Sequence, residues 1–139
     1  MSFKNILCFG TLNPDLIYIV DELPNKGDDI RSLNSSMRPG GTAINCSELI
    51  SLWKKSVQVR GNSIGSDPLG NYLVNYLKEN NINFDGLIIN QSLTPTCSIF
   101  VDSSGERTIV SSGYEGLEWS NFENLNNFDS LIIDRYSIK

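Results

Sequence analysis

A glycine pair that opens a helical pattern constrains this chain more than any other feature. The pair lies in RPGGTAINCSELISLW, residues 38–53. Gly40 and Gly41 lack a Cβ, so the backbone can turn there and come close to a ligand. Apolar residues then recur every three or four positions, which predicts a helix that begins at the pair with its amide groups facing a cleft. The apolar stripe of this helix, widened toward a core by Leu49, is predicted to contain Ala43, Cys46, Ile50 and Trp53.

Polar residues near this helix and near the first strand are candidates for ligand binding. Asn45 lies off the stripe, and its amide can donate and accept hydrogen bonds, which suits a hydroxyl-bearing ligand as well as a neighbouring loop. Residues 4–9 predict a strand buried on both faces, and Asn13 and Asp15 follow its end. Ligands of open α/β sheets bind at the carboxyl ends of strands. Asn and Asp also form turns, and from this stretch alone the turn interpretation is favoured.

The next part of the chain predicts a parallel sheet. Residues 57–62 form a strand pattern that follows a helix, and the order strand, helix, strand is typical of such sheets. A second helix is predicted to begin at Pro68, with Ser66 or Asp67 as its N-cap, and to end at Asn80. Capping accounts for Asp67, which is therefore not a catalytic candidate. The apolar face of this helix contains Leu69, Tyr72, Leu73, Tyr76 and Leu77.

The remaining patterns predict strands and one hairpin. Two β-prone runs around a Gly-containing turn indicate the hairpin, at residues 96–102 and 107–112. A last buried strand covers residues 130–134, and we expect its sheet to be incomplete at Lys139, because such a strand needs a covering helix and usually another neighbour. The other expectations are an apolar strand at 16–20, an exposed strand at 28–36, a strand at 82–89 interrupted at Asp85 and Gly86, and a short helical turn at 122–125.

Composition excludes several classes of function. The 139 residues, 40% of them hydrophobic, suit one domain or part of a larger one. Eleven basic and 16 acidic side chains give a net charge of −5 without a basic cluster, so we expect no nucleic-acid partner. The apolar runs are too short to span a membrane, and a soluble, cytoplasmic protein is expected.

The reactive side chains narrow the chemistry further. The three cysteines, Cys8, Cys46 and Cys97, are far apart in apolar settings, which indicates reduced thiols rather than a disulfide framework or a metal site. The sequence contains no histidine. Any chemistry must therefore come from carboxylates, backbone amides or another chain.

Four motifs in order resemble the N-terminal part of the ribokinase-like carbohydrate kinases of the PfkB family. They are G-T-L-N-P-D after the first strand, P-G-G-T-A-I-N before the first helix, G-N-S-I-G-S-D-P-L-G ahead of the second helix and S-S-G-E-R in the hairpin. The resemblance covers nearly the whole chain. It implies a ribokinase-like three-layer α/β/α fold with a parallel central sheet and a small β-sheet lid, truncated at the C-terminus. Residues 1–139 would form the N-terminal part of one kinase domain, with lid strands at about 16–38 and 96–112.

The resemblance also implies a substrate site for a sugar or another polyol. It changes the interpretation of Asn13 and Asp15 in favour of ligand binding, because a carboxylate and a facing carboxamide can orient neutral hydroxyl groups. It further implies that lids of two subunits pair, so a homodimer through the lid strands is expected. The residues that it assigns to the substrate are Asn13, Asp15, Gly40, Gly41, Asn45 and Asp134.

ATP and magnesium are the cofactors that the resemblance implies. The family's D-T-x-G-A-G-D segment, which carries the catalytic Asp and the anion hole, does not occur in this sequence, and neither does its N-x-x-E magnesium motif. Both belong to the C-terminal, nucleotide-binding half. We therefore expect that the chain alone binds neither cofactor, contains no catalytic residue and is inactive.

Three functions compete. The leading hypothesis is the substrate-binding half of an ATP-dependent sugar kinase. The alternative is a non-catalytic module that binds a sugar or a nucleoside, but such a module should close its sheet, so the incomplete edge after Asp134 favours the first hypothesis. A dinucleotide-binding domain would need G-x-G-x-x-G after the first strand, where Gly10 stands alone.

Overall fold

The computed structural model of the chain describes residues 5–137 and contains three β-sheets and two α-helices. The predicted mixed α/β fold with a parallel sheet is confirmed. In chain order the elements are β1 (Asn5–Gly10), β2 (Asn13–Ile19), β3 (Asn34–Gly40), α1 (Thr42–Leu52), β4 (Ser56–Gly61), β5 (Ile64–Gly65), α2 (Pro68–Glu79), β6 (Ile89–Asn90), β7 (Thr96–Val101), β8 (Arg107–Ser112), the 3₁₀ turn η1 (Leu125–Asn127) and β9 (Ser130–Ile133).

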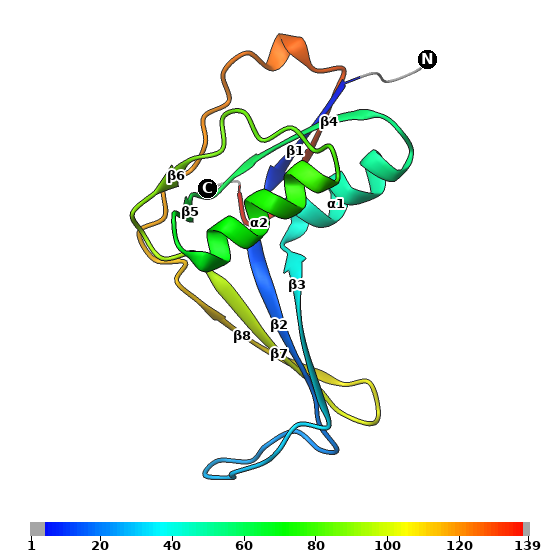
Figure 1. Cartoon of the computed structure of the whole chain (residues 1–139), viewed down its shortest axis with the longest axis vertical. Helices are drawn as coiled ribbons and strands as arrows, with labels where there is room; N and C mark the ends of the chain where they lie inside the picture. The colour runs from blue at the N-terminus through cyan, green and yellow to red at the C-terminus, as the bar shows by residue number, and fades with distance from the viewer. Residues whose placement is uncertain (1–4, 138–139) are drawn as a thin grey trace.

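A three-stranded parallel sheet, in the order β4-β1-β9, forms the body of the molecule. Its central strand β1 is flanked by β4 and β9, so Cys8 lies between Val59 and Ile132. Helix α1 packs on β1 and β4 (Figure 1). Burial of apolar side chains between these layers supplies the main driving force for folding. The core consists of Cys8, Leu12, Ala43, Ile44, Ile50, Val57, Val59, Ile64, Leu73, Leu77 and Ile82.

The opposite face of the same sheet is covered by the segment that follows β8. Phe9 of β1 stacks on Phe122 with ring centroids 4.3 Å apart. Beside Phe9, the buried Arg60 donates a hydrogen bond to the Glu123 carbonyl at 2.8 Å and lies 5.5 Å from the centroid of the Phe128 ring. The segment therefore contributes both an aromatic contact and acceptors for a buried cation, which would be costly to bury unpaired.

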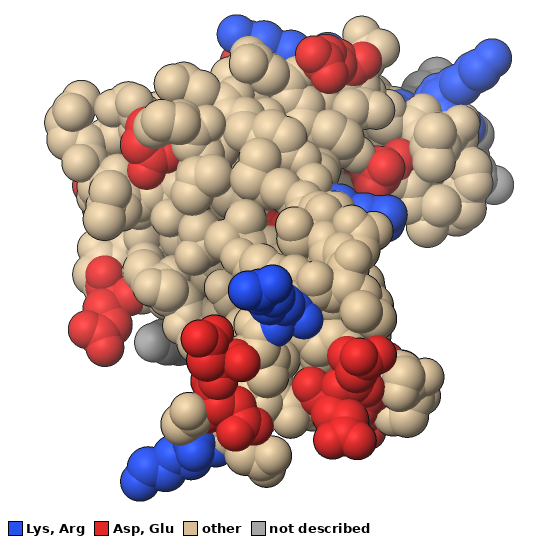
Figure 2. Space-filling model, turned by 60° about the horizontal axis from the view of Figure 1, so that its bottom comes forward, with Lys and Arg blue, Asp and Glu red and all other residues tan. Residues whose placement is uncertain are grey.

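A separate four-stranded sheet, in the order β3-β2-β7-β8, extends away from the body (Figure 1). The predicted hairpin at residues 96–112 is present, because β7 and β8 pair antiparallel. Strand β2 joins this hairpin to β3, with parallel pairing to β7 and antiparallel pairing to β3. We call this element the small sheet. Acidic side chains gather over its free end, next to a few basic ones (Figure 2).

Strand β9 forms one edge of the body sheet. It pairs with β1 alone among the described strands, and its neighbouring residues Leu131 and Ile132, which face opposite sides of the sheet, are 38% and 37% exposed. The predicted last strand is therefore present, but the expectation that it is buried is wrong: within residues 5–137 it has a bare edge and thinly covered faces.

The apolar face predicted for the first helix is confirmed for Ala43 and Ile50 and wrong for Leu49 and Trp53. Leu49 is 49% exposed and Trp53 is 65% exposed, whereas the buried residues of α1 are Ala43, Ile44, Ser47 and Ile50. The helix is thus rotated so that Ile44 and Ser47 face the core. Burial of Ser47 is tolerated because its hydroxyl donates to the Ile44 carbonyl at 2.9 Å.

Other predicted elements differ in extent. The strand expected at 82–89 is wrong in its extent, because only Asn83 bridges to β4 and only Ile89–Asn90 pairs as β6, whereas the interruption expected at Asp85 and Gly86 is present. At this interruption the Asp85 carbonyl accepts a hydrogen bond from Gln58. The strand expected at 28–36 begins only at Asn34, and the helical turn expected at 122–125 lies at Leu125–Asn127. Strand β2 begins at Asn13, earlier than its apolar pattern indicates.

The three cysteines are free, as predicted. Cys8 is buried, whereas Cys46 and Cys97 are half-buried. Burial in the core, together with the nearby Cys46, raises the pKa of the Cys8 thiol to about 12. A thiol with so high a pKa stays protonated at neutral pH and is a poor nucleophile.

The N-cap of α2 is Asp67 rather than Ser66. Its carboxylate accepts hydrogen bonds from the Gly70 amide at 2.8 Å and from both the amide and the hydroxyl of Thr94, at 2.9 and 2.7 Å. One side chain therefore caps the helix and fixes the segment that leads into β7. Burial alone would raise the pKa of Asp67, but the bonds from Thr94 and Gly70 outweigh it and lower the pKa below 3.8.

We predict that Asp67→Ala lowers the free energy of unfolding by about 1–2 kcal/mol, the usual contribution of an N-cap. The exposed Ser66 serves as a control, and Ser66→Ala should change stability by less than about 0.5 kcal/mol. Because the folded-state pKa of Asp67 is lowered, its contribution is complete above pH 3.8 and should disappear as the pH falls below it. Urea unfolding at several pH values measures the difference, and equal losses in both variants would contradict Asp67 as the cap.

Candidate functional site

The candidate site lies where the chain passes from the body sheet to the small sheet. Thr11 and Leu12 make this passage between β1 and β2. Asn62, which follows β4, is fully buried and bonds both backbone groups of Leu12: its Oδ1 accepts from the Leu12 amide at 2.8 Å, and its Nδ2 donates to the Leu12 carbonyl at 3.0 Å. We call this pair of hydrogen bonds the Leu12 bracket. It provides partners for the backbone amide and carbonyl of Leu12, which neither sheet pairs.

Thr11 links this passage to the start of α1. The Thr42 amide donates to the Thr11 hydroxyl at 3.2 Å, and the Ala43 amide donates to the Thr11 carbonyl at 3.1 Å. The expectation that the first amides of this helix face a cleft is therefore wrong for these two, which have partners within the chain. Thr11 thus acts as an N-cap supplied from another segment.

Asn13 and Asp15, at the start of β2, form a hydrogen-bonded pair. Asn13 Nδ2 donates to Asp15 Oδ1 at 2.7 Å, and Asn13 Oδ1 accepts from the Tyr114 hydroxyl at 2.8 Å. Asn13 is 2% exposed, whereas Asp15 is half-buried. No donor within residues 5–137 reaches Asp15 Oδ2. Of this pair, Asp15 is therefore the group that has a free acceptor for a ligand hydroxyl.

The glycine pair is explained by these neighbours. A Cβ on Gly40 would overlap the Asp15 carboxylate, and one on Gly41 would overlap the Thr11 carbonyl. Gly41 also has a φ of 86°, which side chains rarely adopt. The pair thus gives Asp15 and the start of α1 the space that their positions require. Its predicted contact with substrate stays a prediction.

Burial raises the pKa of the Asp15 carboxyl above its ordinary value, although the hydrogen bond from Asn13 acts in the opposite direction. The groups that face Asp15 across the small sheet are Arg38 on β3 and Cys97 on β7. A carboxylate with one donor and partial burial is less well stabilised than one surrounded by donors. A ligand hydroxyl that donates to Oδ2 would therefore offset part of this desolvation.

Asp134 differs from Asp15 because its oxygens already have partners. Oδ2 accepts from the amide and hydroxyl of Thr11, and Oδ1 accepts from the Tyr136 amide and from the amide and hydroxyl of Ser137. Burial would raise the pKa of Asp134, but these bonds outweigh it and lower the pKa below its ordinary value. The structure thus shows Asp134 as a support for Thr11, and its contact with a sugar stays a prediction.

Asn45 is exposed on α1, and its backbone amide donates a hydrogen bond to the Gly41 carbonyl at 3.0 Å. Its side chain makes no contact with Asn13 or Asp15. The structure thus brings together four of the six predicted site residues, Asn13, Asp15, Gly40 and Gly41. Asp134 is connected to them through Thr11, and Asn45 lies one helical turn away.

Sequence reasoning missed three residues that build this site: Thr11, Asn62 and Tyr114. Asn62 and Tyr114 act over 50 and 101 positions of sequence, so no local pattern reveals their partners. Asn62 lies directly after β4, whereas Gly113 separates Tyr114 from the end of β8. A polar side chain at the end of a strand was the signal used for Asn13, and it applies equally to Asn62.

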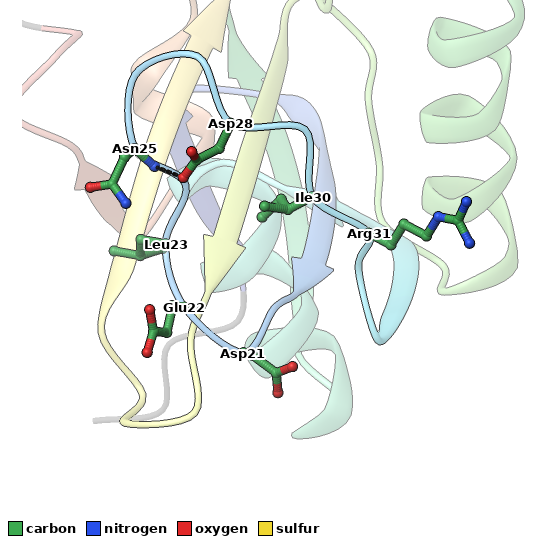
Figure 3. A pocket seen from close by; sticks show the side chains of 7 residues that line it. All are labelled: Asp21, Glu22, Leu23, Asn25, Asp28, Ile30 and Arg31. Carbon is green, nitrogen blue, oxygen red and sulfur yellow. Dashed lines mark hydrogen bonds between the residues drawn. The ribbon is translucent and has the colours of Figure 1, made fainter.

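A hollow lies in the loop between β2 and β3 and has a volume of about 390 Å³. It is lined by Asp21, Glu22, Leu23, Asn25, Asp28, Ile30 and Arg31 (Figure 3). The Asp28 carboxylate accepts from the Asn25 amide at 2.7 Å, and Arg31 extends away from the acidic side chains. Asp21 lies six positions after Asp15 along and just beyond β2, about 20 Å at 3.3 Å per residue. This hollow is a surface feature of the loop, distant from Asp15.

Residues 5–137 contain no group of three or more His, Cys, Asp or Glu side chains placed to hold a metal ion. Within the same residues, no helix has the length and apolar character needed to cross a membrane.

Sequence comparison defines the class of protein to which these features belong. The profile of the pfkB family carbohydrate kinases matches residues 4–138. The chain therefore belongs to the pfkB family of carbohydrate kinases. It is 30% identical to ketohexokinase of Mus musculus over 112 residues, and 28% identical to ribokinase of Dictyostelium discoideum over 108 residues. These alignments cover 79% and 77% of this chain but 37% and 34% of the relatives.

Solved structures show the same fold. The crystal structure of a protein provisionally identified as a ribokinase, from Agrobacterium tumefaciens, superposes with a TM-score of 0.80 at 21% identity, covering 96% of this chain and 45% of that one. Ribokinase of Arabidopsis thaliana, complexed with ribose and ATP, gives 0.67 at 18% identity and covers 81% and 36%. A nucleoside kinase of Burkholderia thailandensis, in complex with inosine, gives 0.67 at 13% identity and covers 77% and 36%. At these identities the structures establish the fold alone.

We predict that Asn62→Ala lowers the free energy of unfolding by about 1–3 kcal/mol, because it leaves buried backbone groups of Leu12 unpaired. Asn75, which is exposed on α2, provides a matched control, and Asn75→Ala should stay within about 0.5 kcal/mol. Thermal or urea unfolding measures both. A loss no larger in Asn62→Ala than in Asn75→Ala would show that the Leu12 bracket does not hold the fold.

Proposed function

We propose that this chain is the substrate-binding portion of an ATP-dependent sugar kinase, in which a sugar or related polyol binds at Asp15. The observation that carries the proposal is the half-buried Asp15 carboxylate, which has one oxygen fixed by Asn13 and the other without a donor. A carboxylate oxygen in this state can accept a hydrogen bond from a neutral hydroxyl group, and a charge-assisted bond of this kind is strong. Family membership supports a carbohydrate hydroxyl as that group.

Further contacts in the proposed site come from the helix and the small sheet. Asn45 supplies a second hydrogen-bonding group, one turn into α1. The small sheet, whose strand β2 carries Asp15, acts as the lid over the sugar. Its edge strand β8 is exposed along its whole length, which suits pairing with a second copy. The proposed location is the cytoplasm.

The alternative is a non-catalytic module that binds a sugar or a nucleoside. The inosine complex of a structurally similar nucleoside kinase keeps nucleosides among the candidate ligands. Both functions use the same Asp15 site, and they differ in whether phosphoryl transfer follows binding. A kinase is favoured because the matched family consists of kinases.

We predict that Asp15→Ala and Asn45→Ala each weaken sugar binding by about 1–3 kcal/mol, the cost of removing a partner of a buried polar group. Calorimetry of the 139-residue chain with D-ribose and D-fructose measures the affinity. Asp29→Ala, in the loop between β2 and β3, and Asn75→Ala are matched controls that should bind like the unaltered chain. Unchanged affinity in Asp15→Ala and Asn45→Ala, with the fold intact, would remove both residues from the site.

We predict further that the chain alone does not phosphorylate a sugar. Phosphoryl transfer requires a positioned donor, metal or backbone groups that neutralise its charge, and a base that takes the hydroxyl proton. The D-T-x-G-A-G-D segment that supplies the base in this family is absent from the sequence. An assay of ADP release with ATP, magnesium and D-ribose or D-fructose should therefore show no sugar-dependent turnover, whereas addition of a family C-terminal half should restore it. Sugar-dependent ADP release by the purified chain, free of contaminating kinase, would contradict the prediction.

A further inference from the structure

Tyr114 connects the segment after β8 to Asp15, the carboxylate proposed to bind the substrate. It follows Gly113, which has a φ of 79° and directs the chain out of β8. The Tyr114 hydroxyl donates to Asn13 Oδ1 at 2.8 Å, and Asn13 Nδ2 donates to Asp15 Oδ1 at 2.7 Å. Tyr114, Asn13 and Asp15 therefore form a chain of hydrogen bonds that ends at the oxygen next to the open one.

The direction of these bonds follows from the chemistry of the groups. An ionised carboxylate only accepts, so the nitrogen of the Asn13 amide must face Asp15. The amide oxygen then faces the Tyr114 hydroxyl, which must donate. Burial is the largest of the effects that raise the pKa of Tyr114, and Cys97, Asp15 and Asp134 raise it further. The hydroxyl therefore keeps its proton across the neutral range and remains a donor.

Asn13 has no other partner that could define its orientation equally well. Its remaining bond is a donation to the carbonyl of the adjacent Pro14 at 3.3 Å, long for a hydrogen bond. Without the Tyr114 hydroxyl, the amide oxygen would be buried without a donor, since Asn13 is buried. Because an unpaired buried acceptor is unfavourable, rotation of the Asn13 amide away from Asp15 would then be favoured.

We propose that Tyr114 is a positioning residue of the substrate site, whose hydroxyl fixes the Asn13 amide so that the amide holds Asp15 with Oδ2 open toward a substrate hydroxyl. The inference rests on the proposed function for the identity of the ligand, but the Tyr114–Asn13–Asp15 geometry does not depend on it. The single proton of the Tyr114 hydroxyl is directed to Asn13, and its oxygen lies 3.7 Å from the sulfur of Cys97.

Tyr114→Phe tests the proposal, because it removes the hydroxyl and keeps the ring. Tyr72→Phe is the matched control: it removes a hydroxyl that donates to the Met37 carbonyl of the small sheet at 3.3 Å, without contact to Asp15. The first measurement is a ¹³C NMR titration of the Asp15 carboxyl in the 139-residue chain without ligand. The bond from Asn13 lowers the pKa of Asp15, so its loss in Tyr114→Phe should raise the midpoint. Tyr72→Phe should titrate like the unaltered chain, in which Asp15 also faces Arg38 and Cys97.

A double-mutant comparison separates positioning from a general effect on the fold. In an Asn13→Ala background the hydrogen bonds that connect Tyr114 to Asp15 are already lost. Tyr114→Phe should therefore not shift the titration midpoint of Asp15 further. An additive second shift would overturn the proposal. So would an Asp15 midpoint that is the same in Tyr114→Phe and in the unaltered chain.

The second measurement uses D-ribose, D-fructose and inosine as separate probes of binding. The dissociation constant of any probe that binds should rise about tenfold in Tyr114→Phe and stay unchanged in Tyr72→Phe. Equal weakening in both variants would overturn the proposal, because it would indicate a general loss of structure. A shifted Asp15 midpoint without binding of any probe would support the positioning role and contradict the proposed function, so the two can fail separately.

Discussion

The bracket that Asn62 forms around Leu12 is the contact on which the rest of the structure depends. Leu12 is fully buried where β1 has ended, and β2 begins at the next residue, so its amide and carbonyl lie beyond the ladders of both sheets. Buried backbone groups without partners are strongly destabilising. Asn62 supplies one acceptor and one donor from the end of the neighbouring strand, and its second donor bonds the Ser63 carbonyl at 2.9 Å. This contact holds the small sheet to the body, and Thr11 and Asn13 take their positions on either side of it.

The number of hydrogen-bond donors around the carboxylate distinguishes the roles of Asp67, Asp134 and Asp15. Asp67 and Asp134 are held by several donors from the chain, and the pKa of each lies below its ordinary value although burial acts to raise it. Asp15 has one donor, and burial raises its pKa. Donors stabilise the charged form, whereas desolvation destabilises it. Asp15 is therefore the carboxylate that has most to gain from a hydroxyl donor, and this difference, rather than its place in a motif, supports it as the binding group.

Local patterns in the sequence predicted much of the fold. The hairpin, the last strand and the second helix with its cap at Ser66 or Asp67 all depend on contacts within a few residues, and each is present. The face of α1 was predicted only in part: Trp53 is exposed, whereas Ile44 and Ser47 are buried, and a serine that bonds its own helix carries no apolar signal. The strand expected at 82–89 is mostly absent because the Asp85 carbonyl accepts a hydrogen bond from the buried side chain of Gln58 in β4.

The site was predicted only in part, for the same physical reason. Asn13, Asp15 and the glycine pair lie next to strand and helix ends, which sequence patterns locate. What Asn13 and Asp134 contact depends on Tyr114 and Thr11, at separations of 101 and 123 residues. Those partners give Asn13 and Asp134 hydrogen bonds within the chain, which the sequence did not reveal, and the contacts of both residues with a substrate stay predictions. Every contact that orients Asp15 comes from within residues 5–137. Because these contacts do not involve a nucleotide, binding of a hydroxyl group and phosphoryl transfer can be tested as separate properties of this chain.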